Sequence, residues 1–276
     1  MFISSFEIFK PGIGPSSSHT MGPMIAAVRF LASLREAAGQ GGNPPTRLTV
    51  TLHGSLAFTG KGHGTDRAVA LGLLGFTPDT LDPDEAEGAL TLLRARQTLT
   101  PPGLPVLHFS PEPDIIFDYG PPLPEHPNGL VFRAWAADDT LCLALTYVSV
   151  GGGFVQTLAE FTAAASGAPP EAPGPAYPYP FRSAAEMLAM GKASGHSIAA
   201  MMRANEEAHG ITDLDAGLDR ISEAMTACIA RGLTREGILP GGLHVRRRAK
   251  SMYETLQRQR QTNRQPPHAV NDWISV

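Results

Sequence analysis

The sequence predicts an α+β fold, in which an N-terminal mixed domain with a mainly antiparallel sheet and helices is followed by a partial all-helical domain. Two observations predict this fold class. Strand-like segments between residues 114 and 150 follow one another without an intervening helical pattern, which favours antiparallel pairing over a doubly wound sheet. After residue 180, in contrast, apolar residues recur with helical spacing.

The first part of the chain contains both kinds of pattern. Residues 21–37 place four apolar side chains on one stripe, as in an amphipathic helix. In residues 47–53 apolar and polar side chains alternate, as in a half-buried strand. A second helical pattern covers Thr65–Leu74. The β-rich runs that follow are Asp114–Asp118, Leu130–Trp135 and Leu141–Val150.

The second part contains three segments with helical spacing, and a fourth helix is expected from about Val245 to Arg260. In the third segment, five apolar side chains share one face, and Gly232 is expected just past the end of that helix. The three segments are Phe181–Lys192, Ser197–His209 and Asp215–Arg231.

A proline-rich stretch, Ser166–Pro180, divides the two parts, because it can sustain neither a helix nor a central strand. We therefore predict a mixed domain over residues 1–165, a semi-rigid linker over residues 166–180 and an incomplete helical domain over residues 181–276.

Composition excludes several classes of protein. The 276 residues are 42% hydrophobic and 17% charged, as in an ordinary soluble protein. A net charge of −4 gives no basic field, so nucleic acid is not the expected partner. No apolar run approaches the roughly 20 residues that a membrane helix needs. The N-terminus does not resemble a signal peptide, so we expect a cytoplasmic protein with no membrane partner.

The segment Gly12–Met24 (GIGPSSSHTMGPM) carries the strongest local signal. Its glycines permit a tight backbone path, and four hydroxyl side chains and an imidazole lead straight into a helix. Free N–H groups at a helix start, together with hydroxyl donors, suit the binding of a carboxylate. Alternatively, Ser18 or Thr20 only caps the helix. Both interpretations stay open from the residues alone.

Two further segments combine glycine with polar side chains. In Thr59–Asp66, Lys61, His63 and Asp66 alternate with glycines between a strand and a helix, which lets a ligand approach the backbone closely. A histidine there is either a proton acceptor or a solvated loop side chain. In Ser149–Gly153, a strand ends in three glycines, which indicates either a structural turn or a close ligand approach.

The chain has two cysteines, Cys142 in a strand-like run and Cys228 in a helical pattern. A lone cysteine in an apolar element is usually a buried small hydrophobe, and we expect this of both. An iron–sulfur cluster needs three or four thiolates, so this chain cannot hold one by itself.

The motif GIGPSSSHT followed by GPM resembles the opening signature of the iron–sulfur-dependent L-serine ammonia-lyases (L-serine dehydratases). Further matches to this family follow in order along nearly the whole chain. They are His53–Leu56, Thr59–Asp66, Tyr147–Phe154, Pro178–Phe181, Cys228–Gly232, Leu239–Gly241 and Arg247–Ala249.

The resemblance implies a carbon–nitrogen lyase of serine catabolism and gluconeogenesis that converts L-serine to pyruvate and ammonia with the help of a [4Fe–4S] cluster. It implies that His63 is the catalytic base. It further implies that substrate is bound by Ser16, Ser17, Ser18, His19, Thr20, Thr65, Ser149, Gly151, Gly152 and Gly153.

The resemblance also implies that the cluster ligands are absent from this chain, because the sequence ends at a family-like segment that a large helical region with the cluster cysteines normally follows. We therefore expect the chain to be truncated, to be inactive alone and to need a C-terminal half or an alpha-type subunit. A homo-oligomer is also expected. The alternative is a non-catalytic regulatory module that binds small carboxylates. A weaker alternative is a nucleic-acid binder that uses the basic residues Arg246–Lys250.

Overall fold

The structure is a computed structural model that describes residues 3–166, 176–239 and 244–262. These residues form two compact units. We call residues 11–166 the sheet unit, and residues 3–10, 176–239 and 244–262 the helical unit. The domain boundaries expected from the sequence stay a prediction. In the structure, residues 3–10 group with the helical part of the chain.

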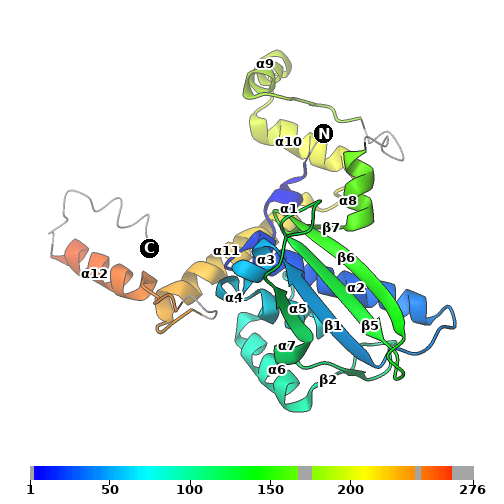
Figure 1. Cartoon of the computed structure of the whole chain (residues 1–276). Helices are drawn as coiled ribbons and strands as arrows, with labels where there is room; N and C mark the ends of the chain where they lie inside the picture. The colour runs from blue at the N-terminus through cyan, green and yellow to red at the C-terminus, as the bar shows by residue number, and fades with distance from the viewer. Residues whose placement is uncertain (1–2, 167–175, 240–243, 263–276) are drawn as a thin grey trace. The chain divides into compact units, whose positions relative to one another are not determined.

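The described residues of the sheet unit form a mixed sheet of seven strands (Figure 1). Its long central strands pair antiparallel, and strands β3 and β4 run parallel to β1. The order is β2-β3-β1-β5-β6-β7, with β4 also paired to β1. The strands are β1 (Arg47–His53), β2 (Thr98–Leu99), β3 (Leu107–His108), β4 (Ile115–Asp118), β5 (Gly129–Trp135), β6 (Leu141–Gly151) and β7 (Phe154–Thr157).

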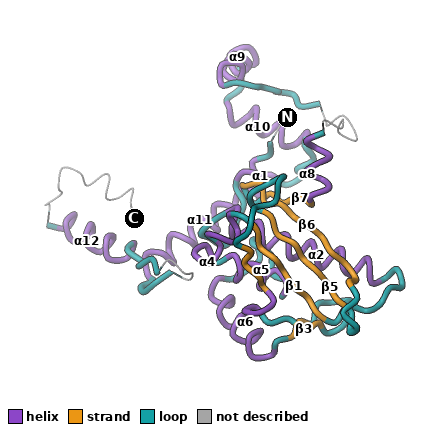
Figure 2. The backbone as a smooth tube through the Cα atoms, in the orientation of Figure 1, coloured by secondary structure: helices purple, strands orange, loops and turns teal. Residues whose placement is uncertain are grey.

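Helices α2 (Gly22–Ala38) and α5 (Thr65–Leu73) cover one face of this sheet (Figure 2). The core lies between them and the strands, because alternate side chains of β1 and β5 are buried there. Phe30 of α2 stacks on Phe132 of β5 with 5.0 Å between ring centroids, and the Phe132 ring meets Tyr147 of β6 edge-on. The other helices of the unit are α3 (Ser55–Phe58), α4 (Gly60–His63), α6 (Pro83–Arg96), α7 (Pro111–Asp114) and α8 (Leu158–Ala165).

The predicted α+β class and the mainly antiparallel sheet are confirmed. The sequence analysis did not predict helix α6 or the parallel pairing of β4 with β1. Helix α6 buries only Ala86, Leu90 and Leu93, so its apolar stripe is too narrow to stand out in a charged segment.

The helical unit contains α1 (Ser5–Ile8) and the four expected helices, α9 (Ala184–Ser194), α10 (Ile198–Ala208), α11 (Leu214–Thr234) and α12 (Ala249–Gln261). The expected end of the third helix at Gly232 is wrong. Helix α11 continues to Thr234, whose hydroxyl donates to carbonyls of the preceding turn. The expected burial of both cysteines is also wrong, since Cys228 on α11 is exposed. None of the described helices is long and apolar enough to cross a membrane.

A buried carboxylate anchors the N-terminal helix within the helical unit. Glu206 of α10 is 1% exposed. It accepts hydrogen bonds from the hydroxyl of Ser4 at 2.7 Å and from the backbone N–H of Ser5 at 2.6 Å. The ring of Phe6 packs so closely on Gly217 of α11 that a Cβ atom there would lie 2.5 Å from it. Helix α1 is therefore an integral part of this unit.

The close packing of α2 against α5 depends on Gly72, because a Cβ atom there would overlap the carbonyl oxygen of Met24 and lie 2.7 Å from the Cβ of Ala27. We expect Gly72→Ala to lower the free energy of unfolding by about 1–3 kcal/mol through overpacking. Gly88→Ala on α6 is the matched control, because it meets open space and should stabilise the helix by roughly 0.5–1 kcal/mol. Urea unfolding followed by circular dichroism measures both. Equal effects of the two variants would contradict the prediction.

Candidate functional site

The serine run forms a π-helical turn, η1 (Ser17–Met21), that leads directly into α2. The N–H of Met21 donates to the carbonyl of Ser16, five residues earlier, at 3.2 Å. The hydroxyl of Ser16 caps the turn by accepting the N–H of His19 at 3.1 Å, so the cap is Ser16 and neither Ser18 nor Thr20. The N–H groups of Ser17 and Ser18 come before that of His19, the first N–H of the turn that donates back to Ser16. N–H groups in the first turn of a helix have no acceptor within it, so donors remain at the start of η1. Single π turns frequently occur at functional sites.

Three hydroxyl groups join η1 to other segments of the sheet unit. Thr65, at the start of α5, donates to the carbonyl of His19 at 2.6 Å. Ser149, at the end of β6, donates to the carbonyl of Ser18 at 2.8 Å. Thr20 donates in turn to the carbonyl of His63 at 2.9 Å. Thr65 and Ser149 are both 0% exposed, so these bonds are shielded from water. They hold η1, the junction of α4 and α5, and the end of β6 close together.

The ring of His63 is held in a defined tautomer. Its Nδ1 lies 2.9 Å from the carbonyl oxygen of Thr59, which can only accept, so Nδ1 carries the proton. In the neutral ring the lone pair therefore lies on Nε2. His63 is half-buried at the end of α4, and Gly64 follows it in the left-handed region at φ 66°. This arrangement suits a side chain that accepts a proton through Nε2.

The ring of His19 lies beside that of His63, with 4.9 Å between their centroids. Both of its nitrogens have hydroxyl partners: Nδ1 lies 2.9 Å from Ser18 Oγ, and Nε2 lies 2.9 Å from Ser55 Oγ. Burial lowers the pKa of His19 below its ordinary value of 6.5, and the charge of His63 lowers it further, while a hydrogen bond with Ser55 opposes both. His19 is therefore favoured as a neutral ring beside His63.

The structure brings most of the predicted site residues together. Ser16, Ser18, His19, Thr20, His63, Thr65 and Ser149 form one hydrogen-bonded cluster. Ser17 lies next to them in η1 with an exposed side chain. Gly151, Gly152 and Gly153 make the turn between β6 and β7, with φ values of 97°, 61° and 74°. A turn with three left-handed residues explains these glycines by conformation alone. Their expected contact with substrate stays a prediction.

Sequence reasoning assigned no role to three residues that shape this cluster. They are Ser55, Thr59 and Gly22. A Cβ atom at Gly22 would collide with Ser149 Oγ, so only glycine permits the bond from Ser149 to Ser18. Gly22 lies in the motif GPM and Ser55 in the motif HGSL. Both motifs carry the family resemblance, and this resemblance is the signal that could have identified the two residues.

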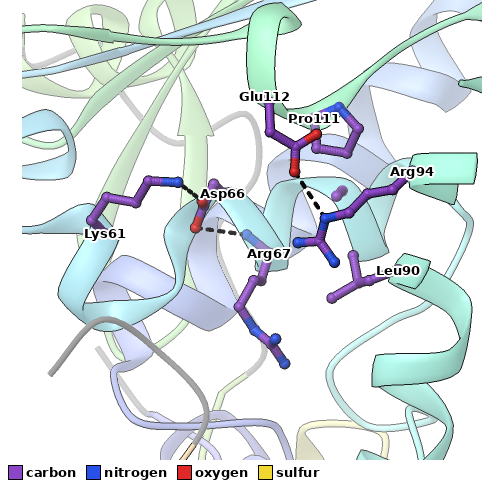
Figure 3. A pocket seen from close by; sticks show the side chains of 8 residues that line it. Lys61, Asp66, Arg67, Leu90, Arg94, Pro111 and Glu112 are labelled. Carbon is purple, nitrogen blue, oxygen red and sulfur yellow. Dashed lines mark hydrogen bonds and ion pairs between the residues drawn. The ribbon is translucent and has the colours of Figure 1, made fainter. Parts of the chain in front are cut away.

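A small hollow lies beside Lys61 of α4 and is lined by residues of α5, α6 and α7 (Figure 3). Each of its cations is paired with a carboxylate: Lys61 with Asp66, Arg94 with Glu112 at 2.8 Å, and Arg67 with Glu87 on α6. An anion would have to displace a carboxylate to enter, and neither histidine lines this hollow. The candidate site is therefore the cluster around His19 and His63.

The residues of this chain do not fit an iron–sulfur cluster. The two cysteines lie in different units, Cys142 on β6 and Cys228 on α11. Burial raises the pKa of the Cys142 thiol, which donates to the carbonyl of Asn43 at 3.4 Å. The part of the chain that the structure describes contains no group of three or more His, Cys, Asp or Glu side chains that could hold a metal ion.

Comparisons with known proteins identify the family of the chain. The family model described as "Serine dehydratase beta chain" matches residues 4–160. An L-serine dehydratase of Streptomyces coelicolor is 39% identical over all of this chain, and L-serine dehydratase 1 of Escherichia coli is 37% identical over 99% of it. The chain spans 59% and 58% of the lengths of these relatives. It belongs to the serine dehydratase beta chain family.

The surroundings of His19 predict a measurable titration. Nuclear magnetic resonance of the imidazole rings should show a His19 pKa below 6.5, and His63→Gln should raise it by removing a neighbouring charge. Neutral His19 is favoured in the folded state, so its contribution to stability is present above about pH 6.5 and is lost as the pH falls through the lower folded pKa. Thr91→Ala on α6 is the control and should leave the titration unchanged. A His19 pKa above 6.5 would contradict the description of its surroundings.

Proposed function

We propose that this chain supplies the substrate-binding and proton-abstracting part of an L-serine dehydratase, which converts L-serine to pyruvate and ammonia. The observation that carries the proposal is the fixed tautomer of His63 within the cluster of hydroxyl groups. The relatives named L-serine dehydratase identify serine as the candidate substrate.

The dehydration of serine requires a base and a binding site for the substrate carboxylate. The Cα–H of serine is weakly acidic, and its removal with loss of the β-hydroxyl as water gives aminoacrylate. Its imine tautomer takes up water and releases ammonia, which leaves pyruvate. His63 is suited to accept the Cα proton, because Nδ1–H is held by Thr59 and Nε2 is free to act as the acceptor.

The start of η1 is suited to bind the carboxylate. The N–H groups of Ser17 and Ser18 begin a helical segment whose dipole, continued by α2, favours a negative charge. The exposed hydroxyl of Ser17 adds a further donor. The hydroxyls of Thr65 and Ser149 are buried and donate to backbone carbonyls of η1, so they stabilise the conformation of this turn.

The proposal includes a [4Fe–4S] cluster bound outside this chain, which would supply Lewis-acid chemistry when present. Its thiolates would come from outside this chain, since the two cysteines present do not form a site. The source would be a segment or alpha-type subunit equivalent to the part of the relatives that this chain does not match. Assembly as a homo-oligomer in the cytoplasm belongs to the same proposal. The names of the relatives favour an enzyme over a regulatory carboxylate-binding module.

Activity should depend on His63 in a way that differs from Ser17. We expect pyruvate formation when the chain is combined, under anaerobic reconstitution with iron and sulfide, with the C-terminal part of the Streptomyces relative. His63→Ala should lower kcat by about 10²–10⁴-fold, the usual contribution of a general base. Ser17→Ala should mainly raise KM, because the free energy of substrate binding loses roughly 1–3 kcal/mol. Near-normal turnover of the His63→Ala complex would refute the assignment of the base and make His19 the next candidate.

The cysteines of this chain should be dispensable for the cluster. We expect the double variant Cys142→Ser, Cys228→Ser to show the same iron content and pyruvate formation as the wild-type chain in the reconstituted complex, because neither residue has thiolate neighbours. The isolated chain should not develop the broad visible absorbance of a [4Fe–4S] cluster after reconstitution. Loss of iron in the double variant would show that this chain contributes a ligand.

A further inference from the structure

Ser55 occupies a rigidly defined position at the start of α3. Gly54, which precedes it, has φ 55°, and a Cβ atom there would overlap the carbonyl oxygen of Pro127. The N–H of Ser55 donates to that same carbonyl at 2.8 Å. Gly54 is therefore needed for β1 to turn directly into α3 and to hold Ser55 against the segment before β5.

The side chain of Ser55 holds one histidine of the cluster. Its Oγ lies 2.9 Å from Nε2 of His19, and Ser18 Oγ lies 2.9 Å from Nδ1 of the same ring. A hydroxyl can both donate and accept, so the ring keeps both partners whichever nitrogen carries its proton. The orientation of the ring is thereby fixed from both edges.

The backbone of the same residue supports the other histidine. The carbonyl of Ser55 accepts the hydroxyl of Thr59 at 2.8 Å and the N–H of Thr59 at 3.0 Å. The carbonyl of Thr59 in turn accepts Nδ1–H of His63 at 2.9 Å. One residue is thus connected to His19 through its hydroxyl and to His63 through one turn of backbone.

We propose that Ser55 is a positioning residue that sets the orientation of both His19 and His63, its hydroxyl acting on the first ring and its carbonyl, through Thr59, on the second. This inference rests on the proposed function only for its catalytic consequence. The two connections are separable, because Ser55→Ala removes the hydroxyl and keeps the carbonyl. Thr59→Val removes the hydroxyl that holds the Thr59 turn and leaves His19 and its partners intact.

Nitrogen-15 spectra of the imidazole rings in the full chain test the geometry without any activity. Ser55→Ala should shift the Nε2 signal of His19 and leave the Nδ1 proton of His63 in place, and Ser55→Thr should restore the His19 signal. Thr59→Val should speed the exchange of the Nδ1 proton of His63 and leave His19 unchanged. Thr91→Ala, whose hydroxyl also bonds a helix carbonyl, is the control and should change neither ring. An unshifted His19 signal in Ser55→Ala would overturn the proposal.

Kinetics in the reconstituted complex test the catalytic consequence. Ser55→Ala should lower kcat about tenfold, as the loss of one hydrogen bond predicts, and change KM by less than about twofold. Ser55→Thr should recover most of the turnover, which a general loss of stability would not explain. A rise in KM with unchanged kcat would overturn the positioning role. Normal turnover of His63→Ala would refute the assignment of the base and leave the positioning role of Ser55 standing, because the ring spectra decide that role independently.

Discussion

The site depends on hydrogen bonds from two buried hydroxyl groups, from Thr65 to the carbonyl of His19 and from Ser149 to the carbonyl of Ser18. Pro23 has no N–H, so it cannot donate to the carbonyl of Ser18, five residues earlier, or of His19, four residues earlier, and a buried carbonyl without a partner is costly. The two donors come from α5 and β6, so the turn is fixed to a helix and to a strand at once. The η1 turn, which carries His19, is consequently held in place by the packed core of the sheet unit.

The sequence predicted those features that follow from local patterns. The alternation of apolar and polar side chains in residues 47–53 predicted β1, and the stripe of apolar side chains in residues 21–37 predicted α2. Both predictions agree with the structure within one residue at each end. The motif GIGPSSSHT and the histidine of Thr59–Asp66 indicated the segments that the structure brings together.

The rest depends on contacts between distant residues, which no local pattern reveals. The π turn is maintained by Ser149, 131 residues after Ser18, and by the absence of a side chain at Gly22. The proton on Nδ1 of His63 follows from the position of the Thr59 carbonyl. Helix α11 continues past Gly232 to Thr234, because glycine lowers helix stability without forbidding the helix.

The anchoring of α1 by Glu206 has a consequence for how the chain can be divided. A single cleavage in residues 167–175 would separate the covalent chain into two pieces, yet α1 would remain on the first piece while its carboxylate partner lies on the second. The pieces would therefore behave as a non-covalent complex, in which an N-terminal tail completes the partner fragment. A helical fragment prepared without that tail would leave Glu206 buried and lacking its two donors, a loss of about 1–3 kcal/mol or more.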